Sequence, residues 1–321
     1  MKAQRRIRRR LRQSLRLAPE VVCFGMVIPA MVFIVDEMPE HNTGGVIKEV
    51  GEFISDDAGI VACLLRGWGV RSGLIGTALG DDYRGRQARR QLRELGVMGR
   101  VRLVEGMTTP YEVNVSDRSG ARTYFWQRDA EVLATLDSAD LGLIHGAKLL
   151  YVDWYDGEPI FRALHTAEEW GVPTFVNLEY GHQDAFLLSR LAGRITICQA
   201  VTNAAQRPGD PLAVARQLLE AGMENVLVTM AGEGCLAARR RTGEFLRAHA
   251  PRLPVVDGCG AGATFSAGFA TGFVRGWSLE DSVRFAVAAA SLKTTAVGPR
   301  AFPRAEVRRL AAQISVERLP L

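Results

Sequence analysis

The stretch of sequence that decides the fold is VDGCGAGATF, residues 256–265. Gly260 and Gly262 flank an alanine, and the small residues that follow are typical of a tightly packed helix. Glycines let backbone N–H groups approach an anion closely, and the first turn of a helix adds the positive end of its dipole. The stretch therefore predicts an anion-binding turn that opens a helix.

The composition is that of an ordinary globular protein. The chain has 321 residues, of which 47% are hydrophobic and 23% are charged. No apolar run approaches the ~18 residues that indicate a membrane span. The five cysteines lack CxxC spacing, which favours reduced thiols in the cytoplasm over a disulfide framework or a zinc site.

The positive net charge belongs to the N-terminus. Residues 1–16 carry eight basic residues and no acidic one, and removing them changes the net charge from +5 to −3. We predict a disordered basic tail at residues 1–19 and one domain at residues 20–321. A solvated extension or an upstream start codon is the favoured interpretation, and an organelle address or contact with nucleic acid or anionic lipid is the alternative.

The rest of the chain alternates between two kinds of segment. Short apolar runs such as residues 21–28 and 224–230 predict buried strands. Segments with helical spacing, such as residues 58–69, 158–170 and 211–221, lie between them. This alternation predicts a three-layer α/β domain with a central, mostly parallel sheet.

Two segments interrupt this alternation, at about residues 31–54 and 101–126. The second reads as strand, turn and strand, with a DRSG turn at residues 117–120. Together the segments predict either a small β-lid that excludes water from a site or two surface loops without a function.

The quoted stretch resembles the D-T-x-G-A-G-D-x-F signature of the ribokinase-like (PfkB) carbohydrate kinases. Asp257, Gly260, Ala261, Gly262 and Phe265 match it. The resemblance extends from residue 21 to about residue 300. It includes GLIGTALGDDYRG after a strand and VLVTMAGEGC at the expected nucleotide strand. It implies the three-layer ribokinase-like fold with its lid.

The resemblance also implies a reaction, the ATP-dependent phosphorylation of a sugar or nucleoside hydroxyl with Mg²⁺. Gly260, Ala261 and Gly262 would form the anion hole. Asp257 would order that turn, near the family's position for a monovalent cation. The residues expected to border the nucleotide are Thr229, Gly232, Gly234 and Ser291, together with Asp257, Gly260 and Gly262.

The sequence departs from the family pattern where proton transfer and sugar binding are expected. Ala263 stands at the position of the catalytic Asp, and a methyl group accepts no proton. Ala30 replaces an Asp that contacts the sugar. The family's Gly-Gly-x-x-x-Asn run, another sugar contact, aligns with Ile54, Ser55 and Gly59. The magnesium-associated Asn-x-x-Glu motif aligns with Asn203 and Gln206. Ala231 stands where the family has a glycine in the nucleotide strand.

Other charged residues are weaker candidates. Asp56 and Asp57 either replace the lost sugar contacts or cap the helix that follows. Arg128 either meets an acidic substrate group or is an ordinary exposed arginine.

Two hypotheses about function follow. One is a cytoplasmic sugar or nucleoside kinase that is impaired by Ala263. The other is a pseudoenzyme that binds or senses a nucleotide or sugar phosphate without turning it over. By resemblance the lids allow a homodimer, whereas membrane and nucleic-acid partners are not expected.

Overall fold

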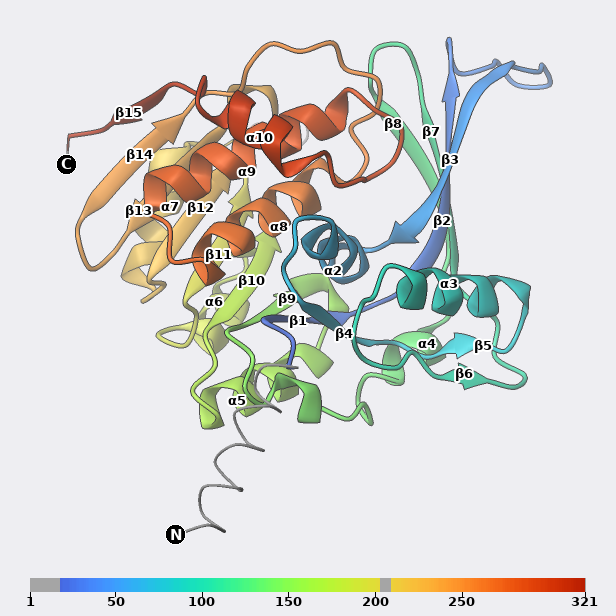
Figure 1. Ribbon diagram of the computed structural model, residues 1–321, viewed down its shortest axis with the longest axis horizontal. Coiled ribbons are helices and arrows are strands. Elements are labelled where there is room, and N and C mark those ends of the chain that lie inside the picture. Colours follow the sequence, from blue (N-terminus) through green and yellow to red (C-terminus); the bar gives the residue numbers. More distant parts are fainter. Residues whose placement is uncertain (1–17, 203–208, 321) are drawn as a thin grey trace, which may run out of the picture.

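The computed structural model describes residues 18–202 and 209–320, and its centre is a nine-stranded sheet (Figure 1). The sheet has the order β15-β14-β13-β12-β11-β10-β9-β1-β4. Neighbouring strands from β4 to β12 are parallel, and β13, β14 and β15 continue the sheet in antiparallel fashion. The strands are β1 (Val21–Gly25), β4 (Ser72–Gly76), β9 (Leu149–Asp153), β10 (Thr174–Glu179), β11 (Ile197–Val201), β12 (Asn225–Thr229), β13 (Cys235–Arg239), β14 (Glu244–Ala248) and β15 (Val316–Arg318).

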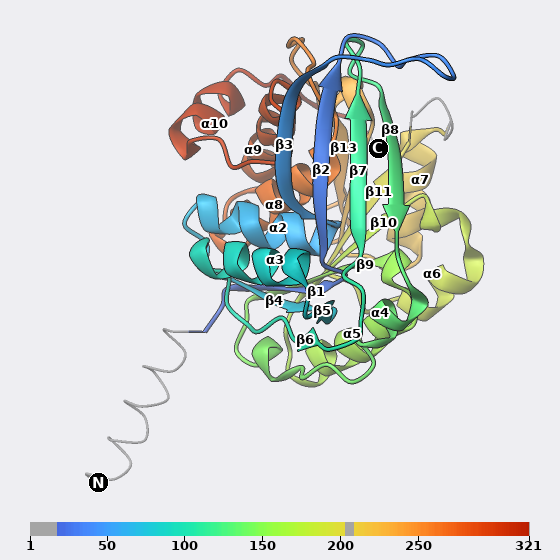
Figure 2. The ribbon, with the colours of Figure 1, turned by 90° about the vertical axis from the view of Figure 1, so that its right-hand side faces the viewer.

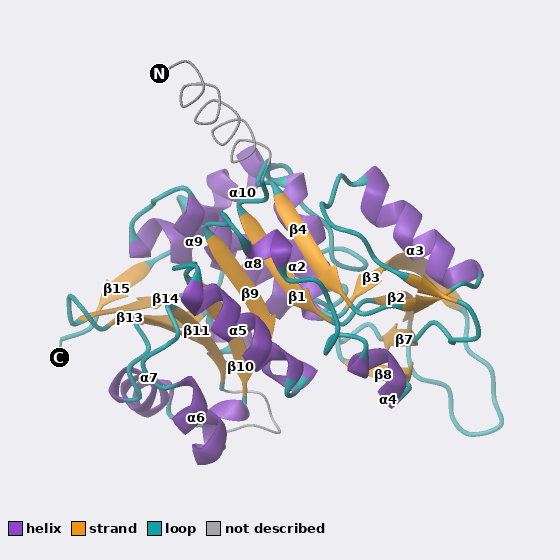
Figure 3. Ribbon diagram, turned by 90° about the horizontal axis from the view of Figure 1, so that it is seen from below, coloured by secondary structure: helices purple, strands orange, loops and turns teal. Residues whose placement is uncertain are grey.

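Helices cover both faces of this sheet. The α-helices are α2 (Asp57–Gly67), α3 (Tyr83–Glu94), α4 (Ala130–Ala134), α5 (Pro159–Glu169), α6 (Ala185–Leu191), α7 (Pro211–Glu220), α8 (Ala261–Val274), α9 (Leu279–Thr294) and α10 (Arg304–Ala311). Short 3₁₀ turns are η1 (Gly142–Ile144), η2 (Trp154–Asp156), η3 (Gly181–Gln183) and η4 (Ala231–Glu233). Figure 3 shows α2, α8 and α9 on one face and α5, α6 and α7 on the other.

The two-residue period of the strands divides the core in two. Cys23 and Tyr151 belong to the cluster that includes residues of α2, α8 and α9. Their neighbours Phe24 and Val152 belong to the cluster that includes residues of α5, α6 and α7. Strands with both faces buried read as continuous apolar runs, which explains the pattern in the sequence.

A small sheet stands beside the main one (Figure 2). Its order is β3-β2-β7-β8, formed by β3 (Ile47–Ser55), β2 (Ile28–Val35), β7 (Tyr111–Ser116) and β8 (Arg122–Gln127). Strands β7 and β8 form the hairpin predicted around residues 117–120, with Gly120 at a φ of 78°. The strands β5 (Leu79–Gly80) and β6 (Leu103–Val104) form a separate pair.

The small residues of α8 bring that helix close to α9, as the sequence predicted. A Cβ atom at Gly268 would lie 2.8 Å from Cα of Ala286, and one at Gly272 would lie 2.4 Å from Oγ of Ser282. Both separations are too short for a real side chain, so glycine is required at each position.

The α/β architecture and the hairpin were predicted correctly, but two features were not. The run at residues 21–28 is not one strand, because β1 ends at Gly25 and β2 then enters the small sheet. The antiparallel edge formed by β13, β14 and β15 was not foreseen. No helix in the described part of the chain is long and apolar enough to cross a bilayer.

Candidate functional site

The glycine turn forms the predicted start of a helix. Gly260 is the N-cap of α8 and has a left-handed backbone with a φ of 73°. Its carbonyl oxygen accepts hydrogen bonds from the amide of Thr264 at 2.9 Å and from Oγ1 of Thr264 at 2.7 Å. Gly262 is exposed, and a Cβ atom there would meet nothing within 4 Å. The first amides of a helix have no partner within it, so this open turn suits an anion.

Asp257 fixes the glycine turn through hydrogen bonds to the backbone. Its buried carboxylate accepts hydrogen bonds from the amides of Cys259 and Gly298, each at 2.9 Å. Although burial opposes ionisation, Lys293 and these amides hold the pKa of Asp257 below its ordinary value. The predicted ordering role of Asp257 therefore has a physical basis in its hydrogen bonds.

The cation beside Asp257 is a lysine. Lys293 is fully buried, and its Nζ lies 2.9 Å from Oδ2 of Asp257 and 2.6 Å from the carbonyl oxygen of the same residue. It also donates to the carbonyl oxygen of Ala296 at 3.1 Å. Burial lowers the pKa of Lys293, and the Asp257 carboxylate opposes that shift. The resemblance implied that Asp257 lies near the family's position for a monovalent cation, and in this structure an ammonium group of the chain itself pairs with Asp257.

A cavity of about 240 Å³ lies next to the glycine turn. We call it the α8 cavity; it is lined by Val201, Thr202, Thr229, Ala231, Gly234, Ala250, Ala261, Gly262, Phe265, Val287, Ala290 and Ser291. Four residues predicted to border a nucleotide therefore meet here: Thr229, Gly234, Gly262 and Ser291. Gly232 lies outside this lining, in η4.

One wall of the α8 cavity has an unusual backbone. Ala231 has a φ of 48°, a left-handed conformation that glycine adopts without strain. The sequence had suggested that Ala231 replaces a glycine, and its backbone retains the conformation that a glycine would take. The conformation at Ala231 is therefore one that a glycine would adopt at lower cost.

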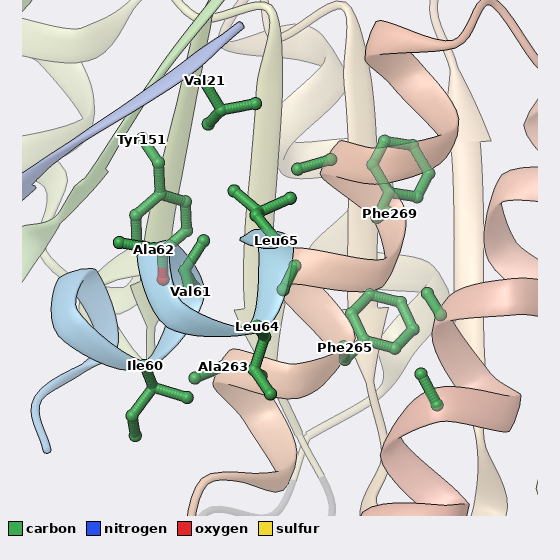
Figure 4. Packing of buried hydrophobic residues seen from close by; sticks show 14 of the residues in the cluster. Val21, Ile60, Val61, Ala62, Leu64, Leu65, Tyr151, Ala263, Phe265 and Phe269 are labelled. Atoms are coloured by element: carbon green, nitrogen blue, oxygen red, sulfur yellow. The ribbon is translucent and has the colours of Figure 1, made fainter. Parts of the chain in front are cut away.

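Ala263, at the expected position of a base, is 1% exposed. It belongs to the same buried hydrophobic cluster as Ile60 and Leu64 of α2 (Figure 4). Nothing at this position can accept a proton.

Carboxylates gather where β9 and β10 end and α2 begins. We call Asp56, Asp57, Asp153, Asp156 and Glu179 the acid cluster. Parallel strands end at the same edge of a sheet, which is where α/β proteins bind ligands. Asp56 has a φ of 65° and Glu179 one of 45°, and such strained residues concentrate at functional sites.

Side-chain hydrogen bonds hold the acid cluster together. Oδ1 of Asp56 caps the amide of Asp57 at 3.0 Å and accepts the hydroxyl of Tyr155 at 2.5 Å. Nδ2 of Asn177 bridges Oδ2 of Asp57 at 3.0 Å and Oδ2 of Asp153 at 2.8 Å. The predicted role of Asp56 as a helix cap is confirmed, and the predicted contact of Asp56 and Asp57 with a sugar stays a prediction.

Burial and neighbouring carboxylates raise the pKa values of three carboxyl groups of this cluster, Asp57, Asp153 and Asp156. Burial, followed by the charges of Glu179 and Asp56, raises the pKa of Asp57 to about 8. Burial and neighbouring carboxylates raise the pKa values of Asp153 and Asp156 well above the ordinary range. A carboxyl group that titrates near neutral pH is suited to exchange protons.

The remaining predicted sugar contacts are buried or already paired. Ala30 is buried in β2 opposite Phe53. Gly59 is buried in α2, where a Cβ atom would lie 2.8 Å from Cγ2 of Ile54. Arg128 is paired rather than free, with Nη2 at 3.1 Å from Glu112 and Nη1 at 3.7 Å from Asp56.

Comparison with known proteins identifies the family. A family model described as pfkB family carbohydrate kinase matches residues 19–305, which include the α8 cavity and the acid cluster. The chain belongs to the pfkB family of carbohydrate kinases.

The relatives that this chain resembles are named for different substrates. A 1-phosphofructokinase from Borreliella burgdorferi is 32% identical over 106 residues, 33% of this chain and 34% of the relative. The chain thus matches about a third of the length of the curated relatives found first. A nucleoside kinase from Methanothermobacter thermautotrophicus is 27% identical over 270 residues, 80% of this chain and 83% of that kinase.

A solved structure supports the fold. Arabidopsis thaliana ribokinase, in complex with ribose and ATP, superposes with a TM-score of 0.71 at 20% identity, covering 92% of this chain and 99% of that one. This likeness confirms the predicted ribokinase-like α/β fold.

By resemblance the reaction uses Mg²⁺, and a motif associated with magnesium was placed at Asn203 and Gln206. Both residues lie outside the described part of the chain. Within residues 18–202 and 209–320, no group of three or more His, Cys, Asp or Glu side chains is arranged to hold a metal ion.

Sequence reasoning missed several residues of the site. Asp153 and Asp156 lie at the end of a buried strand and just beyond it, and that position alone marks them as residues of the ligand-binding edge. Lys293 gave no local signal, because it acquires its role from a partner far away in the sequence.

Proposed function

We propose that this pfkB chain binds ATP in the α8 cavity and transfers its terminal phosphoryl group, slowly, to a hydroxyl group of a sugar or nucleoside. The observation that carries the proposal is the position of the cavity, whose lining includes the first residues of α8. A purine suits the mostly apolar walls, while the phosphates reach the amides of the glycine turn.

The proposed reaction requires little covalent assistance from the protein. The acceptor oxygen bonds to the terminal phosphorus, the bond to the bridging oxygen breaks, and ADP leaves with that electron pair. Positioning and charge stabilisation dominate such transfers. A positioned base contributes only about 10²–10⁴-fold, so its loss at Ala263 slows the reaction without removing every source of catalysis.

The hydroxyl proton needs another destination. Asp57 is half-buried at the start of α2, and its Oδ2 accepts hydrogen bonds from Asn177 and Tyr151. With a pKa of about 8, this carboxyl group is a reasonable acceptor. Solvent is the alternative acceptor.

A second candidate function is a binding or regulatory module without turnover. The burial of Ala263 and the absence of a carboxylate at Ala30 favour it, since by resemblance the first position would hold the base and the second would contact the sugar in a working kinase. Nucleotide binding is common to the two candidates, and the rate of ATP consumption separates them.

Magnesium would accompany the nucleotide. Mg²⁺ commonly binds through substrate phosphates and waters with one or two protein ligands, so a dedicated cluster of side chains is not required. The five free thiols support a cytoplasmic location.

A homodimer in which the small sheets of two protomers pair is part of the proposal. Large apolar side chains are exposed on the two edge strands of the small sheet, β3 and β8: Ile47, Val50, Tyr124, Phe125 and Trp126. Sedimentation equilibrium would detect such a dimer, and a Phe125→Glu variant should then be monomeric.

Calorimetric titration with ATP and ADP, combined with an ATP-consumption assay over a panel of sugars and nucleosides, tests the function. Ala290→Trp fills the α8 cavity and should abolish nucleotide binding, whereas Ala305→Trp, on the exposed side of α10, should not. Binding with slow turnover supports the kinase, and binding without turnover supports the regulatory module. The absence of nucleotide binding in the unaltered protein contradicts both.

A further inference from the structure

A second pocket, of about 340 Å³, lies at the edge of the main sheet that β4 forms. We call it the arginine pocket; it is lined by Leu74, by Arg89, Leu92 and Arg93 of α3, and by residues 97–101. Three strands separate β4 from β11, the strand that contributes Val201 to the α8 cavity (Figure 3). The arginine pocket is therefore separate from the proposed nucleotide site.

The charged side chains of the arginine pocket are all positive. They are Arg89, Arg93 and Arg100, each of them exposed, and no acidic residue belongs to the lining. Within the described part of the chain, none of the three donates a side-chain hydrogen bond or forms an ion pair. By contrast, Nε of Arg86, on the same helix, lies 2.7 Å from Oδ1 of Asp81. The pocket thus carries three arginines whose hydrogen-bond donors are available to a ligand.

This grouping of charges is unfavourable in the free protein. Arg89 and Arg93 are four residues apart, so they project from the same face of α3, and like charges at this spacing repel each other. Arg100 adds a third positive charge from the loop that follows the helix. An anion bound among them would offset this repulsion, and the planar guanidinium fork matches the geometry of a phosphate.

The backbone fixes the loop that carries Arg100. The amide of Leu74 donates to the carbonyl oxygen of Met98 at 2.8 Å, and the amide of Met98 donates to that of Ser72 at 2.9 Å. A Cβ atom at Gly99 would lie 2.4 Å from the carbonyl oxygen of Leu74, so glycine is required where the loop passes β4. The loop is therefore anchored on the edge strand directly before Arg100.

The floor of the arginine pocket is apolar. Leu74, Leu92, Val97 and Val101 line it, and each is at most 8% exposed. A ligand that fills the pocket thus covers apolar side chains as well as positive charges. Small-molecule sites commonly combine apolar walls with a few polar groups that fix the orientation of the ligand.

We propose that the arginine pocket binds an organic phosphate, with the phosphate among the three arginines and the apolar part of the molecule on the floor. No residue of the lining is a nucleophile or a base at neutral pH, so the ligand is bound without being converted. The site is additional to the proposed kinase or regulatory function and does not depend on it.

Methionine-methyl NMR spectroscopy tests the proposal, with phenyl phosphate as the probe. Met98 lines the arginine pocket, so its methyl resonance reports on that site, and Met98→Leu assigns the resonance. Phenol and inorganic phosphate test the two halves of the probe separately. Ala290→Trp, which fills the α8 cavity, shows whether binding at that cavity contributes to the signal.

Phenyl phosphate should shift the Met98 resonance in a saturable manner, and Ala290→Trp should leave this shift unchanged. Arg89→Gln and Arg93→Gln should each weaken the affinity by about 10-fold or more, because each removes hydrogen bonds to a charged group. Arg90→Gln is the matched control and should leave the affinity unchanged, since Arg90 is exposed on the same helix and lies outside the lining. Phenol and inorganic phosphate should each bind more weakly than phenyl phosphate.

The absence of a saturable Met98 shift at millimolar phenyl phosphate overturns the proposal. An equal loss of affinity in Arg90→Gln and Arg93→Gln also overturns it, because the probe would then respond to the overall charge of α3. Phenol or inorganic phosphate binding as tightly as phenyl phosphate overturns the assignment of an organic phosphate. Because Met98 is read in the Ala290→Trp variant as well, failure of nucleotide binding at the α8 cavity leaves this test intact.

Discussion

The α8 cavity and the acid cluster lie at the same edge of the sheet and differ in the side chains that line them. At the cavity, Gly260 and Gly262 are kept, and Ala231 retains the backbone of the glycine it replaces. At the cluster, Asn177 bridges Asp57 and Asp153, and the hydroxyl of Tyr155 donates to Asp56. The comparison shows that the cavity keeps glycines and a glycine-like backbone at positions where the sequence resembles the family, whereas buried carboxyl groups fill the cluster.

The largest effect is expected where the glycine turn is anchored. Lys293→Met leaves Asp257 charged and buried without its partner, and breaking such a pair costs about 3–5 kcal/mol. Urea unfolding should show this loss, together with weaker nucleotide binding. The double variant Asp257→Asn/Lys293→Met should recover part of the stability, and a single-variant loss below about 1 kcal/mol would mean that the pair is not an anchor.

Ala263→Asp tests how much stability the fold loses when a carboxyl group is placed at the expected position of the base. The position lies in an apolar cluster with Ile60 and Leu64, so a carboxyl group there should cost about 1–3 kcal/mol of unfolding free energy. Ala261→Asp, at the half-buried first residue of the helix, is the control and should cost much less, because an acidic residue there favours the helix dipole. Equal losses in the two variants would contradict the described burial of Ala263.

Asp57→Asn probes the acid cluster through its pH dependence. The pKa of Asp57 is about 8 in the folded protein against an ordinary value near 3.8, so the folded state binds its proton more tightly. Its contribution to stability is therefore complete below about pH 4 and is lost as the pH rises through about 8. The asparagine side chain cannot ionise, so the variant should melt a few degrees higher than the unaltered protein at about pH 8.5.

The same comparison at about pH 4 should show little difference, and Asp137→Asn, at an exposed position, should change neither melting curve. A gain at the acidic pH equal to that at the alkaline pH would show that charge is not the cause.

The smallest effect is expected at Ala231. A left-handed backbone costs a non-glycine residue about 1–2 kcal/mol, and the extra entropy of an unfolded glycine offsets part of that cost. Ala231→Gly should therefore stabilise the protein by about 0.5–1 kcal/mol, measured by urea unfolding. Ala192→Gly, at an exposed residue with negative φ, should not stabilise it.

The sequence predicted the features that depend on neighbouring residues. The glycine turn, the strand and helix alternation and the β7–β8 hairpin follow from local spacing and turn chemistry. Thr229 and Ser291 lie far apart in the chain, so local spacing could not bring them together. Only the family resemblance predicted that both border one site, and both line the α8 cavity.

The features that sequence reasoning missed depend on docking between distant elements. Lys293 is an ordinary helical lysine until the loop at Asp257 reaches it from 36 residues away. Ser116 is an ordinary strand residue until its hydroxyl donates to Oδ1 of Asp257 at 2.8 Å and anchors the hairpin to that loop. Neither partnership leaves a periodic or compositional trace, so neither could have been inferred before the fold was known.

The ammonium of Lys293 has a consequence for how the protein would respond to its surroundings. Because the ammonium group that balances the charge of Asp257 is part of the chain, it cannot dissociate as a free metal cation would. The protein should therefore keep its nucleotide affinity when potassium is exchanged for sodium or a bulky organic cation at constant ionic strength, and its loop should keep its shape during dialysis.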